Sequence, residues 1–244
     1  GHEIGRHQIH GALRHTTDLE QPIEEQAGGR GLRQTLGGVV ADHVDGVPLQ
    51  GQAPGAAMLL NDRSFVTAAR KAIARQQPSV MHDVGAVMRQ MIASALHHAR
   101  ADMALTEPAF ALYYAQRQRV TLFDDALPAL EHLAQRYRLV ALTNGNADIH
   151  AIGLTRYFEA SISAADVGAA KPEAAMFEAA AAAMQVQPEQ ILHVGDDPRM
   201  DGMGALQLDM QMVWINREQA DWPYARGRRP HLIAPDLSTL RQWL

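Results

Sequence analysis

The sequence contains no cysteine, and this absence excludes disulfide bonds, thiolate zinc sites and a cysteine nucleophile. No apolar run approaches the roughly 18 residues that a membrane span requires, and the N-terminus lacks the basic and apolar stretches of a signal peptide. The net charge of −5 and the isoelectric point near 6.2 argue against a general nucleic-acid binder. We therefore expect a cytoplasmic protein with neither a membrane nor a nucleic acid as its partner, and the oligomeric state stays open.

Aromatic residues are absent before Phe65, whereas residues 1–56 contain 11 of the 19 glycines. Such a segment has little large apolar surface to bury, so its composition differs from that of a packed core. Residues 38–41 (Gly-Val-Val-Ala) are its short strand candidate. We expect residues 1–56 to form an atypical N-terminal segment that is disordered or not native to the protein.

Beyond this segment the hydrophobic periodicity changes twice. Apolar residues three and four apart predict helices over residues 65–74, 84–96 and 110–115, which indicates a helical subdomain over residues 57–118. From residue 119 to 244, short apolar runs alternate with helical patterns. The expected strands are 139–142, 160–163, 191–194 and 210–215, and the expected helices are 126–137, 149–154, 173–184 and 200–207.

This alternation of helices with strands that are apolar throughout indicates an α/β fold, in which a doubly wound parallel sheet is covered on both faces. In such a fold the ligand lies at the carboxyl ends of the strands. The residues that follow each apolar run are therefore the candidates for a functional site.

An acidic group follows strand 191–194, where Gly195 is succeeded by Asp196, Asp197 and, about one helical turn further on, Asp201. Carboxylates this close repel one another, so a fold that places them together usually supplies a cation, and their oxygens suit Mg²⁺. The alternative is an acidic turn whose aspartates cap the helix that follows.

Thr143 and Asn144 follow strand 139–142 in a Thr-Asn-Gly-Asn turn, whose hydroxyl and main-chain N–H groups can cradle a phosphate. The alternative is an ordinary Asn-Gly turn.

Lys171 is one of two lysines among 22 basic residues, and it lies just before the helix expected over 173–184. Because a cation is unfavourable at a helix N-terminus, we expect an anionic partner for its ammonium group; the alternative is a surface lysine without a role.

These residues and their spacing resemble motifs two, three and four of the haloacid dehalogenase superfamily of phosphatases. The resemblance extends over residues 59–244 and is closest to a subgroup with a small helical cap inserted before motif two, which includes bacterial flavin mononucleotide phosphatases. It implies that residues 57–118 form the cap and that residues 119–244 form the Rossmann-like α/β core.

The resemblance also implies a role for each candidate residue. Thr143 and Asn144 would bind the phosphoryl group, and Lys171 would neutralise charge on that group and on the nucleophile. Asp201 would in addition pair with Lys171. The Mg²⁺ ion would be held by three acidic residues: Asp196, Asp201 and Asp197.

The first motif of the family, an apolar strand that ends in Asp-x-Asp, is absent from this chain. In the family its first carboxylate attacks phosphorus and its second acts as acid and base. The nearest candidates are Asp42 and Asp45 after residues 38–41, but one residue too many separates them, so an extended chain puts them on opposite faces. The Phe-Asp-Asp sequence ending at Asp125 lies too close to Thr143 to leave room for a cap, and we interpret Asp125 as a helix cap.

The resemblance predicts a Mg²⁺-dependent phosphomonoester hydrolase acting on a small phosphorylated metabolite, with flavin mononucleotide or a related riboflavin precursor as the leading substrate. Without the first motif, the chain would instead be a catalytically inactive member of this fold that binds a metal or a phosphate ligand. A 2-haloacid dehalogenase is a third alternative, but that reaction needs no metal and leaves the cluster around Asp196 without a purpose. His193, inside strand 191–194, is interpreted as a buried core residue.

The abrupt change of composition generates a test of residues 1–56. If a reading-frame error, a replaced segment or a wrongly assembled sequence produced them, DNA sequencing of the source and the intact mass of the protein will reveal a different N-terminal peptide. A confirmed native start that yields the same residues would refute this hypothesis.

Overall fold

The computed structural model describes residues 8–10, 49–224 and 227–244. These residues divide into two compact units, one made of residues 49–119 and the other of residues 8–10 together with the described part of 120–244. No helix among the described residues combines the length and the apolar composition needed to cross a bilayer. The strand candidate 38–41 lies outside the described residues.

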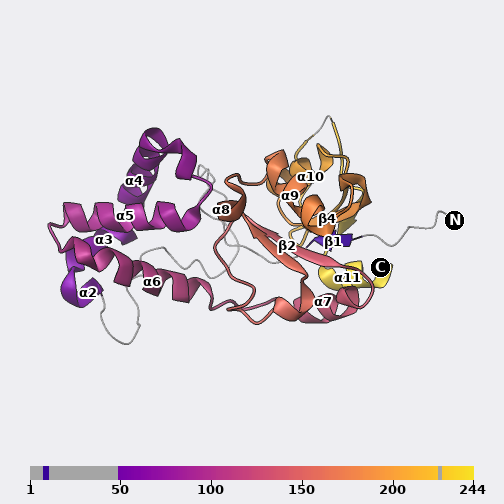
Figure 1. The fold of residues 1–244 in the computed structure, drawn as a ribbon, viewed down its shortest axis with the longest axis horizontal. Coiled ribbons are helices and arrows are strands. Elements are labelled where there is room, and N and C mark those ends of the chain that lie inside the picture. The colour runs from indigo at the N-terminus through magenta and orange to yellow at the C-terminus, as the bar shows by residue number, and fades with distance from the viewer. Residues whose placement is uncertain (1–7, 11–48, 225–226) are drawn as a thin grey trace. The chain divides into compact units, whose positions relative to one another are not determined.

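The unit of residues 49–119 consists of helices joined by short turns (Figure 1). Its elements are α2 (Leu49–Gln52), α3 (Pro54–Asn61), α4 (Arg63–Gln76), η1 (Pro78–Val80), α5 (Val84–His98), η2 (Met103–Leu105) and α6 (Thr106–Arg117). The carboxylates of Asp62 and Asp83 accept main-chain N–H groups in the first turns of α4 and α5, which explains where these helices begin. The helices predicted at 65–74, 84–96 and 110–115 are confirmed within α4, α5 and α6.

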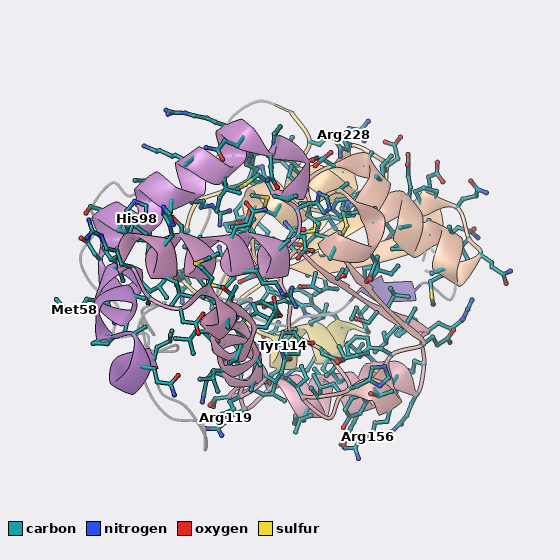
Figure 2. The ribbon with its side chains drawn as sticks, turned by 60° about the vertical axis from the view of Figure 1, so that its left-hand side comes forward. Met58, His98, Tyr114, Arg119, Arg156 and Arg228 are labelled. Carbon is teal, nitrogen blue, oxygen red and sulfur yellow. The ribbon has the colours of Figure 1, made fainter. Side chains whose placement is uncertain are left out.

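Helix α5 is the centre of this helical unit, because it contacts α3, α4 and α6. Its side chains Met88, Met91 and Ile92 are at most 1% exposed and belong to one apolar cluster with residues of those helices. Met58 of α3 is 74% exposed and lies at the periphery of the unit (Figure 2). The helical unit therefore has a hydrophobic core of its own.

The second unit is built on a six-stranded parallel sheet with the strand order β3-β2-β1-β4-β5-β6. The strands are β1 (Gln8–His10), β2 (Leu139–Thr143), β3 (Ala160–Ser163), β4 (Ile191–Gly195), β5 (Gln211–Ile215) and β6 (Leu232–Ala234). The order reverses direction at β1, which lies between β2 and β4. This point of reversal, at the carboxyl ends of the strands, is where an open α/β sheet binds its ligand.

Helices cover both faces of the sheet (Figure 1). Helices α7 (Ala126–Ala134) and α11 (Leu237–Trp243) pack on one face, and α9 (Ala174–Met184) and α10 (Gly204–Leu206) pack on the other. Shorter elements join them: η3 (Thr155–Tyr157), α8 (Ala164–Val167), η4 (Pro188–Gln190) and η5 (Pro198–Met203). Residues along β4 alternate between the two apolar clusters, since Ile191 faces α9 while Leu192 and Val194 face α7 and α11. The predicted α/β fold with a doubly wound parallel sheet is confirmed.

Several elements differ from the sequence prediction. The helix predicted over 149–154 is wrong, because these residues form turns that lead into η3. The prediction missed β1, β6 and α11, which are three to seven residues long and too short to show a hydrophobic period. The helix predicted over 200–207 is instead a π-helical segment, η5, followed by the short α10.

Asp125 stands at the N-cap position of α7, but the interpretation of its side chain as a helix cap is wrong. Both of its carboxylate oxygens accept from Nη2 of Arg217, each at 2.9 Å, and Oδ2 also accepts the main-chain N–H of Leu237 at 2.8 Å. The guanidinium of Arg217 in turn lies over the ring of Phe123. Asp125 thus joins the start of α7, the segment after β5 and the start of α11.

We expect Asp125→Ala to lower the free energy of unfolding by about 1–3 kcal/mol, because it leaves a half-buried guanidinium and a main-chain N–H without their acceptor. Asp124→Ala is the matched control, since Asp124 is the exposed neighbour, and it should change stability by less than about 0.5 kcal/mol. Urea unfolding followed by circular dichroism measures both variants. Equal stabilities of the two would show that the contacts of Asp125 contribute nothing.

Candidate active site

The turn after β2 is organised by two side chains that the sequence placed at a phosphate site. Thr143 is 5% exposed, and its hydroxyl oxygen accepts the main-chain N–H of Gly145 at 2.8 Å, which closes the turn. The side chain of Asn144 accepts the N–H of Lys171 at 2.7 Å and donates to the carbonyl oxygen of Lys171 at 2.9 Å. The Asn144 amide therefore holds Lys171 in place, and a phosphate contact from Asn144 would come from its main chain.

Lys171 has the anionic partner that its place before α9 led us to expect. Its ammonium nitrogen Nζ lies 2.7 Å from Oδ1 of Asp201 and 3.2 Å from the carbonyl oxygen of Leu142. The side chains of Lys171 and Asp201 are 12% and 7% exposed, so this ion pair is largely removed from water. Loss of one partner would leave the other charge buried and uncompensated.

The Asp201 carboxylate has three donors. Oδ1 accepts from Lys171 and from Nε2 of His193, which lies 3.0 Å away, and Oδ2 accepts the main-chain N–H of Asp197 at 3.1 Å. Burial alone would raise the pKa of Asp201, but the Lys171 ammonium and the His193 hydrogen bond together hold it well below its usual range. Asp201 is therefore a carboxylate anion throughout the physiological pH range.

Gly195, the last residue of β4, makes room for this carboxylate. A Cβ atom at Gly195 would lie 2.3 Å from Cγ of Asp201, far inside van der Waals contact. The absence of a side chain at this position is what allows Asp201 to lie against the end of the strand.

His193 is buried, 1% exposed, as the sequence led us to expect, and its ring packs edge-on against Phe177. Burial lowers the pKa of His193, and this outweighs the opposing effect of the Asp201 carboxylate. This shift favours the neutral ring, and since the Asp201 carboxylate can only accept, we assign the hydrogen to Nε2. The sequence interpretation missed this contact, because a histidine within an apolar strand carries no sign of its partner.

Asp196 and Asp197 have different surroundings. Asp197 is the N-cap of η5, where its Oδ1 accepts the N–H groups of Arg199 and Met200 at 2.7 Å each. For this residue, the alternative of an aspartate that caps the following helix matches the observed contacts. Asp196 reaches solvent, and its carbonyl oxygen accepts from the indole of Trp214 at 2.9 Å. The protein atoms around its carboxyl group reduce its hydration, and this effect, with the negative charge of Asp201, raises the pKa of Asp196 to about 6.

These surroundings fit a cation beside Asp196. No side chain or main-chain group of another described residue donates to its carboxylate, and the nearby Lys171 ammonium lowers its pKa by less than reduced hydration and the charge of Asp201 raise it. Within residues 8–10, 49–224 and 227–244, no three acidic, histidine or cysteine side chains form a group that could hold a metal. A Mg²⁺ ion commonly uses one or two carboxylates, with water and substrate phosphate completing its ligands, so Asp196 is the candidate ligand that this part of the chain supplies.

The site predicted from the sequence is brought together in part. Lys171 and Asp201 are in direct contact, Asn144 and His193 each bond to one of them, and Thr143 closes the same turn as Asn144. The two candidates for the nucleophile, Asp42 and Asp45, lie outside the described residues.

A family model for haloacid dehalogenase-like hydrolases matches residues 24–209, which include Thr143, Lys171, Asp196 and Asp201. The chain belongs to the haloacid dehalogenase-like hydrolases. The matched range also includes the segment that contains Asp42 and Asp45.

The curated relatives of this chain include phosphatases. The chain is 33% identical over 178 residues to 5-amino-6-(5-phospho-D-ribitylamino)uracil phosphatase YigB of Escherichia coli strain K12, which covers 70% of this chain and 74% of that protein. It is 32% identical over 111 residues to a phosphoserine phosphatase of Thermus thermophilus, which covers 43% of this chain and 45% of that protein. These relatives confirm the expectation of a phosphatase-type enzyme of the haloacid dehalogenase superfamily.

Solved structures share the fold. The crystal structure of a 2-haloacid dehalogenase from Pseudomonas syringae pv. Tomato DC3000 superposes with a TM-score of 0.73 at 30% identity, covering 80% of this chain and 87% of that one. A phosphatase of the superfamily from Thermococcus onnurineus has a TM-score of 0.55 at 24% identity, covering 80% and 87%. The latter likeness concerns the fold alone.

We expect Asp201→Ala to lower the free energy of unfolding by about 3–5 kcal/mol, because it leaves the Lys171 ammonium without its carboxylate partner in a site that is largely removed from water. Asp221→Ala removes an exposed carboxylate of the same unit and should change stability by less than about 0.5 kcal/mol. Chemical unfolding of both variants makes the comparison. If both behave like the parent protein, the Lys171–Asp201 ion pair is not a buried interaction in solution.

Proposed function

We propose that this haloacid dehalogenase-like hydrolase is a Mg²⁺-dependent phosphomonoesterase whose substrate is a small phosphorylated metabolite. The observation that carries the proposal is the buried Lys171–Asp201 ion pair, which holds an ammonium group beside the Thr143 turn at the carboxyl end of β2. An ammonium group fixed in this way can meet the negative charge of a phosphoryl group without reorganisation of the site.

Each candidate residue has a role that its contacts support. Thr143 and the main-chain N–H groups of its turn would bind the phosphoryl oxygens, with Asn144 contributing from its main chain. Lys171 would neutralise the charge that develops during transfer, and Asp201 would keep that ammonium group in position. Asn144 would fix the main chain of Lys171 through its two hydrogen bonds.

Asp196 would hold the Mg²⁺ ion, and Asp201 and Asp197 would act on it from a greater distance through ordered water, since their oxygens already accept other donors. The ion, when bound, supplies positive charge that draws electron density from the phosphoryl oxygens. Asp196 suits this role because, among the described residues, only its own main chain donates to its carboxylate.

Asp42 and Asp45 are the proposed source of the nucleophile and of the acid and base. A carboxylate would attack phosphorus to form an acyl phosphate while the alcohol leaves, and water would then release inorganic phosphate. The two residues are three apart rather than two, so a bulge between them is needed to bring both carboxylates to one face.

The helical unit of residues 49–119 would act as the cap that selects the substrate, as in the subgroup that the sequence resembles. For the substrate we propose a phosphorylated riboflavin precursor or flavin mononucleotide, on the strength of the relationship to YigB. The alternative is a protein of this family that binds a metal or a phosphate ligand without turnover, which the missing Asp-x-Asp motif favours.

We expect the purified chain to hydrolyse p-nitrophenyl phosphate when Mg²⁺ is present and to lose that activity after chelation. Lys171→Met should lower kcat by about 10²–10³-fold, because the charge on the phosphoryl group is no longer met by an ammonium group. Lys71→Met is the matched control, since Lys71 is exposed on α4 and should leave kcat unchanged.

The same assay separates the alternatives. Absence of metal-dependent turnover, together with binding of inorganic phosphate or Mg²⁺ by calorimetry, would establish the non-catalytic protein. Release of chloride from 2-chloropropionate without any metal would establish a dehalogenase, the activity named for the P. syringae structure.

For an active chain, we expect Asp42→Asn to abolish turnover and Asp45→Asn to lower it, because an amide neither attacks phosphorus nor transfers a proton as a carboxylate does. Asp18→Asn, in the same N-terminal segment, is the control and should retain activity. Trapping of the acyl phosphate by mass spectrometry identifies the nucleophile directly. Full activity of both Asp42 and Asp45 variants would place the nucleophile elsewhere in the chain.

A further inference from the structure

A buried histidine in β4 bonds to the same carboxylate that holds Lys171, and the proposed phosphatase roles do not use it. Nε2 of His193 lies 3.0 Å from Oδ1 of Asp201, and Nζ of Lys171 lies 2.7 Å from that oxygen. His193 is 1% exposed, so it is not a residue that a substrate could touch without rearrangement. Its contact therefore acts on Asp201.

Strand geometry explains why His193 is beside Asp201. Side chains two residues apart in a strand share a face, so His193 and Gly195 both face the side of the sheet that α9 covers. Asp201 occupies the space that a side chain at Gly195 would fill, and the His193 ring lies next to that space, backed by Phe177 of α9. The Phe177 ring thus packs against the His193 ring, whose Nε2 points toward the Asp201 carboxylate.

We propose that His193 is a positioning residue, whose Nε2–H group fixes the Asp201 carboxylate so that Oδ1 faces the Lys171 ammonium. A carboxylate at the end of a side chain turns freely about its terminal bond unless both oxygens are held. Here Oδ2 is held by the main-chain N–H of Asp197, and Oδ1 is held by His193 and Lys171. Without the His193 donor, Oδ1 is held only by the Lys171 ammonium, whose own position depends on that oxygen.

The lysine content of the chain offers a readout that does not depend on catalysis. Lys71 and Lys171 are the two lysines, and they differ in surroundings, because Lys71 is exposed and the Lys171 side chain is 12% exposed in an ion pair. Reductive methylation followed by peptide mass spectrometry measures the rate at each. In the parent protein Lys171 should react much more slowly than Lys71, which serves as the internal standard.

Two polar substitutions separate the donor from the general packing of the site. His193→Gln can place an amide N–H near the position of Nε2, whereas the shorter side chain of His193→Asn cannot reach Asp201. We expect the methylation rate of Lys171, relative to Lys71, to rise by about tenfold or more in His193→Asn and to stay within about twofold of the parent in His193→Gln. Equal rates in the two variants would overturn the proposal.

Phe177→Leu is the control for loosened packing, since it removes the ring behind His193 and keeps the donor. A rise in Lys171 reactivity as large as that of His193→Asn would show that packing, rather than the hydrogen bond, protects the lysine. Histidine ¹⁵N spectra of the unmodified protein add a measurement that needs no stable variant. A neutral ring with its hydrogen on Nε2 supports the proposal, and a ring with its hydrogen on Nδ1 would contradict it.

The kinetic consequence rests on the proposed phosphatase function. His193→Asn should lower kcat by about 10–100-fold with a smaller change in KM, and His193→Gln should restore most of the loss. If the chain has no phosphatase activity, the methylation and ¹⁵N measurements still decide the role of His193. Failure of the proposed function is therefore distinguishable from failure of this inference.

Discussion

The buried ion pair between Lys171 and Asp201 is the interaction on which the candidate site depends. It joins the loop before α9 to the helical segment after β4, two segments that are 30 residues apart in the chain. Burying two charges away from water costs desolvation energy. The pair stabilises the fold only when the other hydrogen-bonding atoms of both side chains also have partners. Here Leu142, His193 and the main chain of Asp197 supply those partners.

The topology of the sheet makes this arrangement possible. Strands β2 and β4 both flank β1, where the strand order reverses, so their carboxyl ends open toward the same edge. Thr143 ends β2 and Asp196 follows β4, which places a hydroxyl group and a carboxylate at that edge. The Asn144 amide then ties the Lys171 main chain to the turn after β2. Elements from three parts of the chain are thus locked around one edge by side-chain hydrogen bonds.

Much of both units could be predicted from the sequence, because the central strands are continuous apolar runs and the longer helices have a clear hydrophobic period. The predicted ranges agree within a residue or two with strands β2, β3, β4 and β5 and with helices α4, α5 and α9. Short elements such as β1 and β6 escaped prediction, since three residues carry no measurable period. Residues 149–154 form a turn although their apolar spacing predicts a helix, because Ile149 and Leu154 are buried in the core without helical structure between them.

The sequence by itself determined the chemistry of the site: a hydroxyl residue and two carboxylates directly follow apolar strands, a third carboxylate lies about one turn further on, and one of the two lysines precedes a helix. The tertiary structure alone decided which of these groups meet. In the folded chain Asp201 pairs with Lys171 and His193, Asp197 caps the start of η5, and the Asn144 amide bonds to Lys171. The Asp196 carboxylate has no donor from another described residue. The physical reason is that hydrogen bonds and ion pairs between distant segments depend on the order of the strands and on the space that a residue such as Gly195 leaves for a neighbouring side chain. Local sequence patterns specify neither of these properties.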